Sequence, residues 1–317
     1  MNLRWLSALV PFAIVFACGG GGSNFGNGDS GDGGINFGDG PAFGDTGGGD
    51  GSGTVATCAA ASAAKSYVGC DYWPTVTGNA VWSIFDFAVV VANASGQTAN
   101  ITITGPNATS QTGSVPAGQA QKFYLPWVKS LKGDDFDPDT SVAGIAFTAS
   151  VIAHGGAYHL VNDVPVSIYQ FNAIEYKPAD GPPNKNWGAC PNDQLNQVEC
   201  FSYSNDASLL LPSTAITGNY RVMNQKGWSE GAPILGPYFV ITATADATQV
   251  TVKTSATSQV LAGGGIPATN GAGTFSLTMN KGDAAEVVGS PGDQDDLSGT
   301  LVQATHPVQV ITGEQCV

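Results

Sequence analysis

Three short motifs occur twice along the chain, each time in the same order. They are Trp73-Pro-Thr-Val-Thr-Gly-Asn79 with Leu211-Pro-Ser-Thr-Ala-Ile-Thr-Gly-Asn219, the apolar segments 87–90 and 101–103 with 238–241 and 250–252, and Asp163-Val-Pro-Val-Ser-Ile168 with Thr305-His-Pro-Val-Gln-Val310. Each second copy follows the first by about 140–150 residues, and such regular spacing indicates two copies of one structural unit. We therefore expect a fold that is built twice.

The segments inside these copies are typical of β-strands. Phe87-Ala-Val-Val-Val-Ala92 is an apolar run of strand length, and Asn100-Ile-Thr-Ile-Thr104 alternates as a half-buried strand does. Val164-Pro-Val-Ser-Ile-Tyr-Gln-Phe171 is a further strand, with Pro165 near its start, where a missing N–H is tolerated. No stretch keeps a helical period over three turns.

These patterns predict an all-β chain with two related β-sandwich-like units in tandem. Each copy needs roughly six or seven strands to bury its apolar faces, either as a sandwich of its own or as a double sandwich in which the copies share strands. We place the first unit at residues 61–180 and the second at residues 206–317. A Pro/Asn-rich connector at residues 181–205 joins them.

The N-terminus is typical of an export signal. After Arg4 comes an apolar run of about thirteen residues, too short to span a bilayer, so residues 1–17 are predicted to be a signal peptide. Ala17-Cys18-Gly19 resembles the lipobox of bacterial lipoproteins, which predicts lipidation of Cys18 and a membrane anchor. Gly19 in place of an aspartate favours the outer membrane or cell surface. The alternative is a plain secretory signal in which Cys18 is incidental.

Residues 18–60 are predicted to be a disordered linker that follows the anchor. Gly, Asn, Asp and Ser dominate it, and residues 19–54 contain no Lys or Arg. Such a segment buries too little apolar surface to offset its ordering entropy.

Cysteine usage and charge both favour an extracellular protein. Cys58 with Cys70, and Cys190 with Cys200, look like two local disulfides of an oxidising compartment, although free thiols or other pairings stay open. Cys316 is left over, so we expect the second unit to continue past Val317. The net charge of −14 repels phosphate backbones, which argues against nucleic-acid binding.

The sequence contains no motif that predicts catalysis, so we expect no enzymatic activity. His154, His159 and His306 belong to no metalloprotease motif, and no G-x-S-x-G is present. The best metal candidates are Asp135, Asp137 and Asp139, whose alternation could aim three carboxylates at one Ca²⁺; the alternative is a solvated acidic loop. No other cofactor is predicted. Tryptophans such as Trp73 could stack on sugars, but are more often core anchors.

Several segments together resemble one known family. They are Ser66-Tyr-Val-Gly-Cys-Asp-Tyr-Trp-Pro-Thr75, Phe123-Tyr-Leu-Pro-Trp127, Ala157-Tyr-His-Leu-Val-Asn-Asp-Val-Pro-Val166, Tyr169-Gln-Phe-Asn172, Ser208-Leu-Leu-Leu-Pro-Ser-Thr214 and Gly218-Asn-Tyr220. This set resembles the IgGFc-binding protein N-terminal domain family over residues 67–316. The resemblance implies an extracellular, non-catalytic, adhesive module, and it carries no residue-level binding site.

The resulting hypothesis is a cell-surface adhesion or binding module displayed on a lipid-anchored flexible stalk. Its expected partners are the membrane, through the anchor, and an extracellular protein or glycan. The alternative function is a carbohydrate-binding accessory domain or an envelope hydrolase.

Overall fold

The computed structural model describes residues 56–135, 147–178, 182, 185–187, 201–202, 205–227, 236–292 and 295–315. Within these residues the chain is nearly all β, as predicted, and two short helices, Cys58–Ala64 (α1) and Lys129–Lys132 (α2), accompany the strands. No helix in this part of the chain is long and apolar enough to cross a membrane.

The first unit is organised around one long bent strand, β7 (His159–Asn172). The first half of β7 pairs with β3 (Ala99–Gly105) and β1 (Gly69–Tyr72), and β4 (Thr109–Val115) extends that layer beside β3. The second half pairs with β2 (Phe87–Asn93) and β8 (Asp206–Leu210), and β5 (Gln119–Leu125) extends that layer beside β2. The two layers therefore share β7 and enclose one core.

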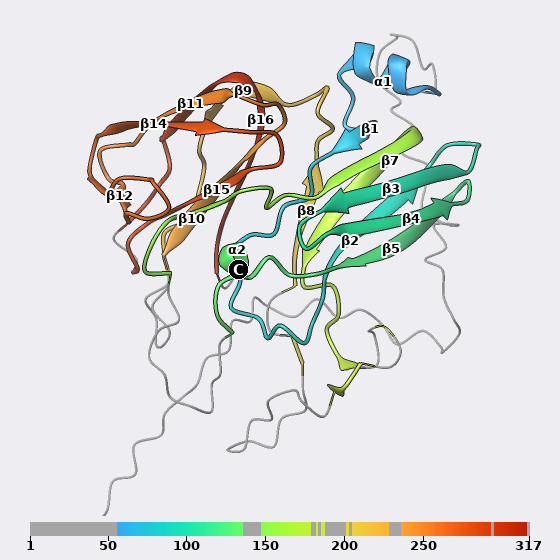
Figure 1. The fold of residues 1–317 in the computed structure, drawn as a ribbon, viewed down its shortest axis with the longest axis horizontal. Helices are drawn as coiled ribbons and strands as arrows, with labels where there is room; N and C mark the ends of the chain where they lie inside the picture. Colours follow the sequence, from blue (N-terminus) through green and yellow to red (C-terminus); the bar gives the residue numbers. More distant parts are fainter. Residues whose placement is uncertain are drawn as a thin grey trace, which may run out of the picture.

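The second unit repeats this arrangement around β16 (Leu301–Glu314). The first half of β16 pairs with β11 (Thr248–Lys253) and β9 (Thr217–Arg221), and β14 (Thr274–Met279) lies beside β11. The second half pairs with β10 (Pro237–Ala243), which also pairs with β15 (Ala284–Val288). A two-stranded sheet of β12 (Gln259–Val260) and β13 (Thr269–Asn270) is added. The tandem β-sandwich-like units predicted from the repeated motifs are confirmed (Figure 1).

The two long strands carry their prolines at the same point. Pro165 lies between the last β7 residue paired with β3, Asn162, and the first paired with β2, Ser167. Pro307 lies between the residues of β16 that pair with β11 and those that pair with β10. A proline lacks the N–H that a ladder needs, so it fits where a strand changes partner.

Each unit takes one strand from the other copy. The strand β6 (Val151–Ala153) precedes β7 in the chain, yet it pairs with β15 of the second unit. The strand β8 directly precedes the second copy of the repeated motif, yet it pairs with β7 of the first unit. Of the two arrangements that the sequence allowed, the structure has the one in which the copies share strands.

The hydrophobic cores of the two units both include residues of β10. Tyr238 and Val240 of β10 join the core of the first unit, together with Phe87 and Val89 of β2. The other face of β10, with Phe239 and Ile241, fills the core of the second unit. Because β10 is buried on both faces, its sequence Pro-Tyr-Phe-Val-Ile-Thr-Ala lacks the apolar–polar alternation of a half-buried strand.

Candidate functional site

The first copy of the repeated motif, residues 73–79, forms a buried seam between the two units. Its backbone and hydroxyl groups bond to both sides. The N–H of Thr75 donates to Gln170 Oε1 (3.0 Å), and Gln170 Nε2 donates to the carbonyl of Thr75 (2.9 Å). The hydroxyls of Thr75 and Thr242 on β10 are 2.8 Å apart. This segment therefore holds β7 of one unit against β10 of the other.

The same seam contains the buried carboxyl group of Glu286 and a glycine, Gly78, that leaves no room for a side chain. Glu286 of β15 is fully buried, and its Oε1 accepts from the N–H of Gly78 (2.8 Å). Burial raises the pKa of Glu286 well above its usual range, against the opposing effect of this hydrogen bond. A Cβ on Gly78 would lie 2.3 Å from the Phe147 ring. The junction is therefore closely packed as well as polar.

The rim of the seam carries an Asp–His pair from the first unit. His159 Nε2 is 2.9 Å from Asp71 Oδ2, and the His159 ring stacks on Trp73 with centroids 4.2 Å apart. Burial raises the pKa of Asp71, but hydrogen bonds from His159 and Ser213 outweigh it and lower the pKa below its usual value.

The other two histidines have structural partners. His154 Nδ1 lies 3.2 Å from Asp283, which also accepts from the N–H groups of Gly155 and Asn280. His306 lies 3.5 Å from the hydroxyl of Thr248. These contacts join turns and strand ends of the scaffold.

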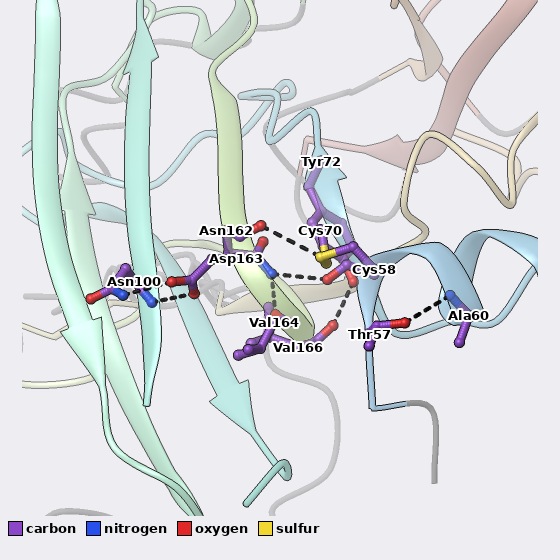
Figure 2. Close-up of a disulfide and its surroundings, with 11 residues drawn as sticks. Thr57, Cys58, Ala60, Cys70, Tyr72, Asn100, Asn162, Asp163, Val164 and Val166 are labelled. Carbon is purple, nitrogen blue, oxygen red and sulfur yellow. Dashed lines mark hydrogen bonds between the residues drawn. A yellow bond between two sulfur atoms is a disulfide. The ribbon is translucent and has the colours of Figure 1, made fainter. Parts of the chain in front are cut away.

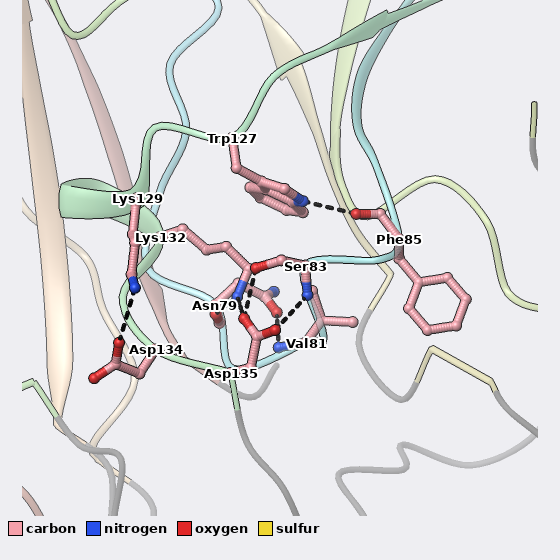
Figure 3. Close-up of polar contacts among 9 residues, drawn as sticks. All are labelled: Asn79, Val81, Ser83, Phe85, Trp127, Lys129, Lys132, Asp134 and Asp135. Carbon is pink, nitrogen blue, oxygen red and sulfur yellow. Dashed lines mark hydrogen bonds and ion pairs between the residues drawn. The ribbon is translucent and has the colours of Figure 1, made fainter. Parts of the chain in front are cut away.

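Asp135, the first of the predicted calcium ligands, is bound to a lysine. Its carboxylate receives the ammonium of Lys132 (2.7 Å) and the N–H and hydroxyl of Ser83 (2.8 and 2.6 Å) (Figure 3). Burial raises the pKa of Asp135, but the charge and hydrogen bond of Lys132 and the hydrogen bonds from Ser83 together outweigh it and lower the pKa. Asp137 and Asp139 lie outside the described residues, so calcium binding stays a prediction. Among the residues described, no three His, Cys, Asp or Glu side chains gather around one point.

Lys132 itself is part of the scaffold. Its side chain is buried, and the ammonium also donates to the carbonyl of Asn79 (3.3 Å) and lies 5.4 Å from the centre of the Trp127 ring. In Figure 3, Lys132 lies between the strand-end loop at Asn79 and the acidic loop at Asp135. The Asp135 carboxylate is therefore paired with the ammonium group of Lys132.

The predicted disulfide between Cys58 and Cys70 is confirmed. It joins α1 to β1, and Cys58 Sγ lies 3.8 Å from the carbonyl of Asn162 on β7 (Figure 2). Cys190 and Cys200 lie outside the described residues, as does the predicted lipidation site Cys18.

One exposed apolar surface lies where β1 and β8 meet along β7. Tyr169 of β7 is directly opposite Leu209 of β8, and they are 39% and 45% exposed. Leu211 and Tyr67 are 42% and 61% exposed, and the chain segments that carry them meet where Gly69 packs on Pro212. We call these four residues the β7–β8 patch. Exposed apolar side chains that lie next to each other, as the paired Tyr169 and Leu209 do, are typical of interaction surfaces.

The four tryptophans that the structure describes do not form such a surface. Trp73 and Trp82 are buried, and Trp127 and Trp187 are half-buried. Trp228 lies outside the described residues. In the part of the chain that the structure describes, tryptophans therefore serve as core anchors.

The β7–β8 patch lies partly in a segment that matches a protein-family model. Residues 206–317 match the family model described as IgGFc binding protein. The predicted resemblance to this family is confirmed over those residues. No curated protein matches the chain.

The IgGFc-binding match begins at Asp206, the first residue of β8. It therefore includes the second unit together with the strand that this copy contributes to the first unit. Leu209 and Leu211 of the patch lie inside the match, and Tyr169 lies outside it. The patch thus combines residues from the IgGFc-binding match with residues from the first unit.

The exposed patch could not be predicted from the sequence. Ser208-Leu-Leu-Leu211 has no alternation that would separate buried from exposed positions, and only its pairing with β7 turns Leu209 outward.

Proposed function

We infer that this protein is a non-catalytic binding module of the bacterial cell surface, and that it binds an extracellular protein through the β7–β8 patch. The observation that carries this proposal is the match of residues 206–317 to the IgGFc binding protein family, together with the exposure of Leu209 and Leu211 within that region.

The composition of the patch supports protein binding. Tyrosine contributes a large apolar area with a polar tip, and it is enriched at interfaces. The patch also lies on paired strands that the seam and the disulfide support, so binding needs little ordering of the scaffold. The net charge of −14 favours a basic partner.

Binding is tested with the full chain against immobilised extracellular proteins, immunoglobulin Fc among them. A double variant, Tyr169→Ser with Leu209→Ser, should weaken any interaction at least tenfold, because these side chains lie side by side. Met223→Ser is the matched control, since Met223 is 82% exposed and lies outside the patch. Equal loss in both variants would place the binding site elsewhere.

The anchor is a separate part of the proposal, supported by the signal peptide and the lipobox-like Ala17-Cys18-Gly19. After cell fractionation, Cys18→Ala should move the protein from the membrane to the soluble fraction. A variant that stays with the membrane as the wild type does would exclude lipid anchoring at Cys18.

The proposed binding needs no cofactor. Calcium at Asp135, Asp137 and Asp139 is tested by calorimetric titration of the purified chain. No heat of binding and no rise in melting temperature with millimolar Ca²⁺ would exclude this site.

A further inference from the structure

We propose that Lys185 and Asp86 form an intramolecular amide bond, which fastens the connector between the two units to the first unit. Asp86 immediately precedes β2, and Lys185 lies 99 residues further along the chain. The ammonium nitrogen of Lys185 contacts Asp86 Oδ2 and the carbonyl oxygen of Ile84. The two reacting groups are therefore already in contact.

A third group, Glu175, lies where it can move a proton between them. Its side chain is buried, and its Oε2 accepts from the N–H of Asp86 (2.7 Å). Its Oε1 is 3.8 Å from Lys185 Nζ and has no hydrogen-bond partner in the described part of the chain. Burial, reinforced by the neighbouring carboxyl of Asp86, raises the pKa of Glu175 to about 7. Such a carboxyl exchanges a proton readily at neutral pH.

The contact between the two groups is partly shielded from water, because the side chains of Lys185 and Asp86 are only 18% and 22% exposed. The Lys185 nitrogen lies 5.0 Å from the centre of the Trp187 ring, which contacts Phe85 at 5.5 Å. Trp127 closes the same region through a hydrogen bond to the carbonyl of Phe85 (2.7 Å) (Figure 3). An uncharged lysine amine is the nucleophilic form, so the reaction begins when Lys185 transfers one proton to the Asp86 carboxylate that it contacts.

The reaction is a condensation that needs no added reagent. The neutral Lys185 nitrogen attacks Cγ of the protonated Asp86 carboxyl and forms a C–N bond. Glu175 accepts the proton that the nitrogen loses and delivers it to the departing hydroxyl, whose C–O bond breaks. The products are one amide and one water molecule, no group is oxidised or reduced, and Glu175 returns to its starting state.

The primary test is the intact mass of the purified full chain. The amide predicts a mass about 18 Da below that calculated for the same processed chain with its disulfides, because one water is lost. Proteolysis of the wild type should also yield a branched peptide that joins residues 86 and 185. A full mass with no branched peptide would overturn the proposal, and because both readouts use the wild type, they do not depend on the folding of a variant.

Variants then assign the roles. Lys185→Met and Asp86→Ala should each show the full mass of their own sequence. Glu175→Gln keeps the size of the side chain but cannot relay a proton, so it should leave most of the chain unlinked. Lys122→Arg, an exposed position on β5, is the matched control and should still lose the water. Retention of the water loss in Lys185→Met would place the modification elsewhere and contradict the assignment.

Discussion

At the scale of single residues, the junction depends on polar groups that are buried and held by hydrogen bonds. The carboxyl of Glu286 faces the backbone N–H of Gly78, and the amide of Gln170 bonds twice to Thr75. A buried polar group without a partner is costly, so these contacts also select one alignment of the two units. The first copy of the repeated motif, residues 73–79, therefore helps to align the two units through these hydrogen bonds.

The protonation of Glu286 makes stability depend on pH. Its pKa is raised in the folded state, so the folded protein keeps a proton that the unfolded chain releases above its ordinary pKa of 4.5. The free energy of unfolding should therefore fall as pH rises from about 5 to 8. Glu286→Gln, which can still accept from Gly78, should reduce this slope and stabilise the protein at pH 8 by at least about 1 kcal/mol.

Urea unfolding at several pH values measures this effect. Glu175 and Glu314, whose pKa values burial also raises to about 7, should keep part of the slope in the variant. An unchanged slope in Glu286→Gln would show that Glu286 ionises normally in the folded protein.

Gly78 provides a steric test of the same seam. A methyl group there would meet Phe147 at 2.3 Å and Tyr238 at 3.0 Å, so Gly78→Ala should lower the free energy of unfolding by about 1–3 kcal/mol. Gly96→Ala is the matched control, because a Cβ at Gly96 has nothing within 4 Å. Equal stabilities in denaturant titrations would mean that the seam is loosely packed.

At the scale of elements, the local patterns were enough to predict individual strands. The apolar run 87–92 became β2, the alternation at 100–104 lies within β3, and the segment 164–171 lies within β7. Pairing between distant segments could not be predicted in the same way. β8 looks like the first strand of the second copy, and only its contact with β7 assigns it to the first sheet.

The helix α1 depends on a covalent link to a strand. The Cys58–Cys70 disulfide closes a loop of 12 residues and holds α1 against β1 and β7. Replacing both cysteines by alanine should lower the free energy of unfolding by about 2–3 kcal/mol in the chain-entropy model. Hydrogen exchange should show faster exchange of the amides of α1, while β10 stays protected. Unchanged exchange in α1 would mean that packing alone holds the helix.

At the scale of the whole molecule, neither unit is complete without the other. β8 completes a layer of the first unit, β6 extends the second, and Tyr238 and Val240 of β10 join the first core. The duplication itself could be predicted from the sequence because it repeats local motifs. The exchange could not, and neither could the contact of Lys185 with Asp86, because both depend on how the two copies pack in space.

The region that matches the IgGFc binding protein family should therefore not fold alone. Residues 206–317 on their own leave β8 without β7 and expose the face of β10 that the first unit covers. We expect this fragment to show no cooperative thermal transition, whereas the chain from residue 56 onward melts cooperatively. Circular dichroism and two-dimensional NMR of both proteins make the comparison. A well-dispersed spectrum of the fragment would contradict the expectation.

The exchange of β6 and β8 also has an evolutionary consequence. Deleting either copy from the gene would remove a strand that the surviving copy's sheet uses, and would uncover a face that the lost copy had shielded from water. A return to a single-copy ancestor would then require compensating substitutions at the vacated strand position. For a protein with strands shared in this way, the doubling of the gene is effectively irreversible.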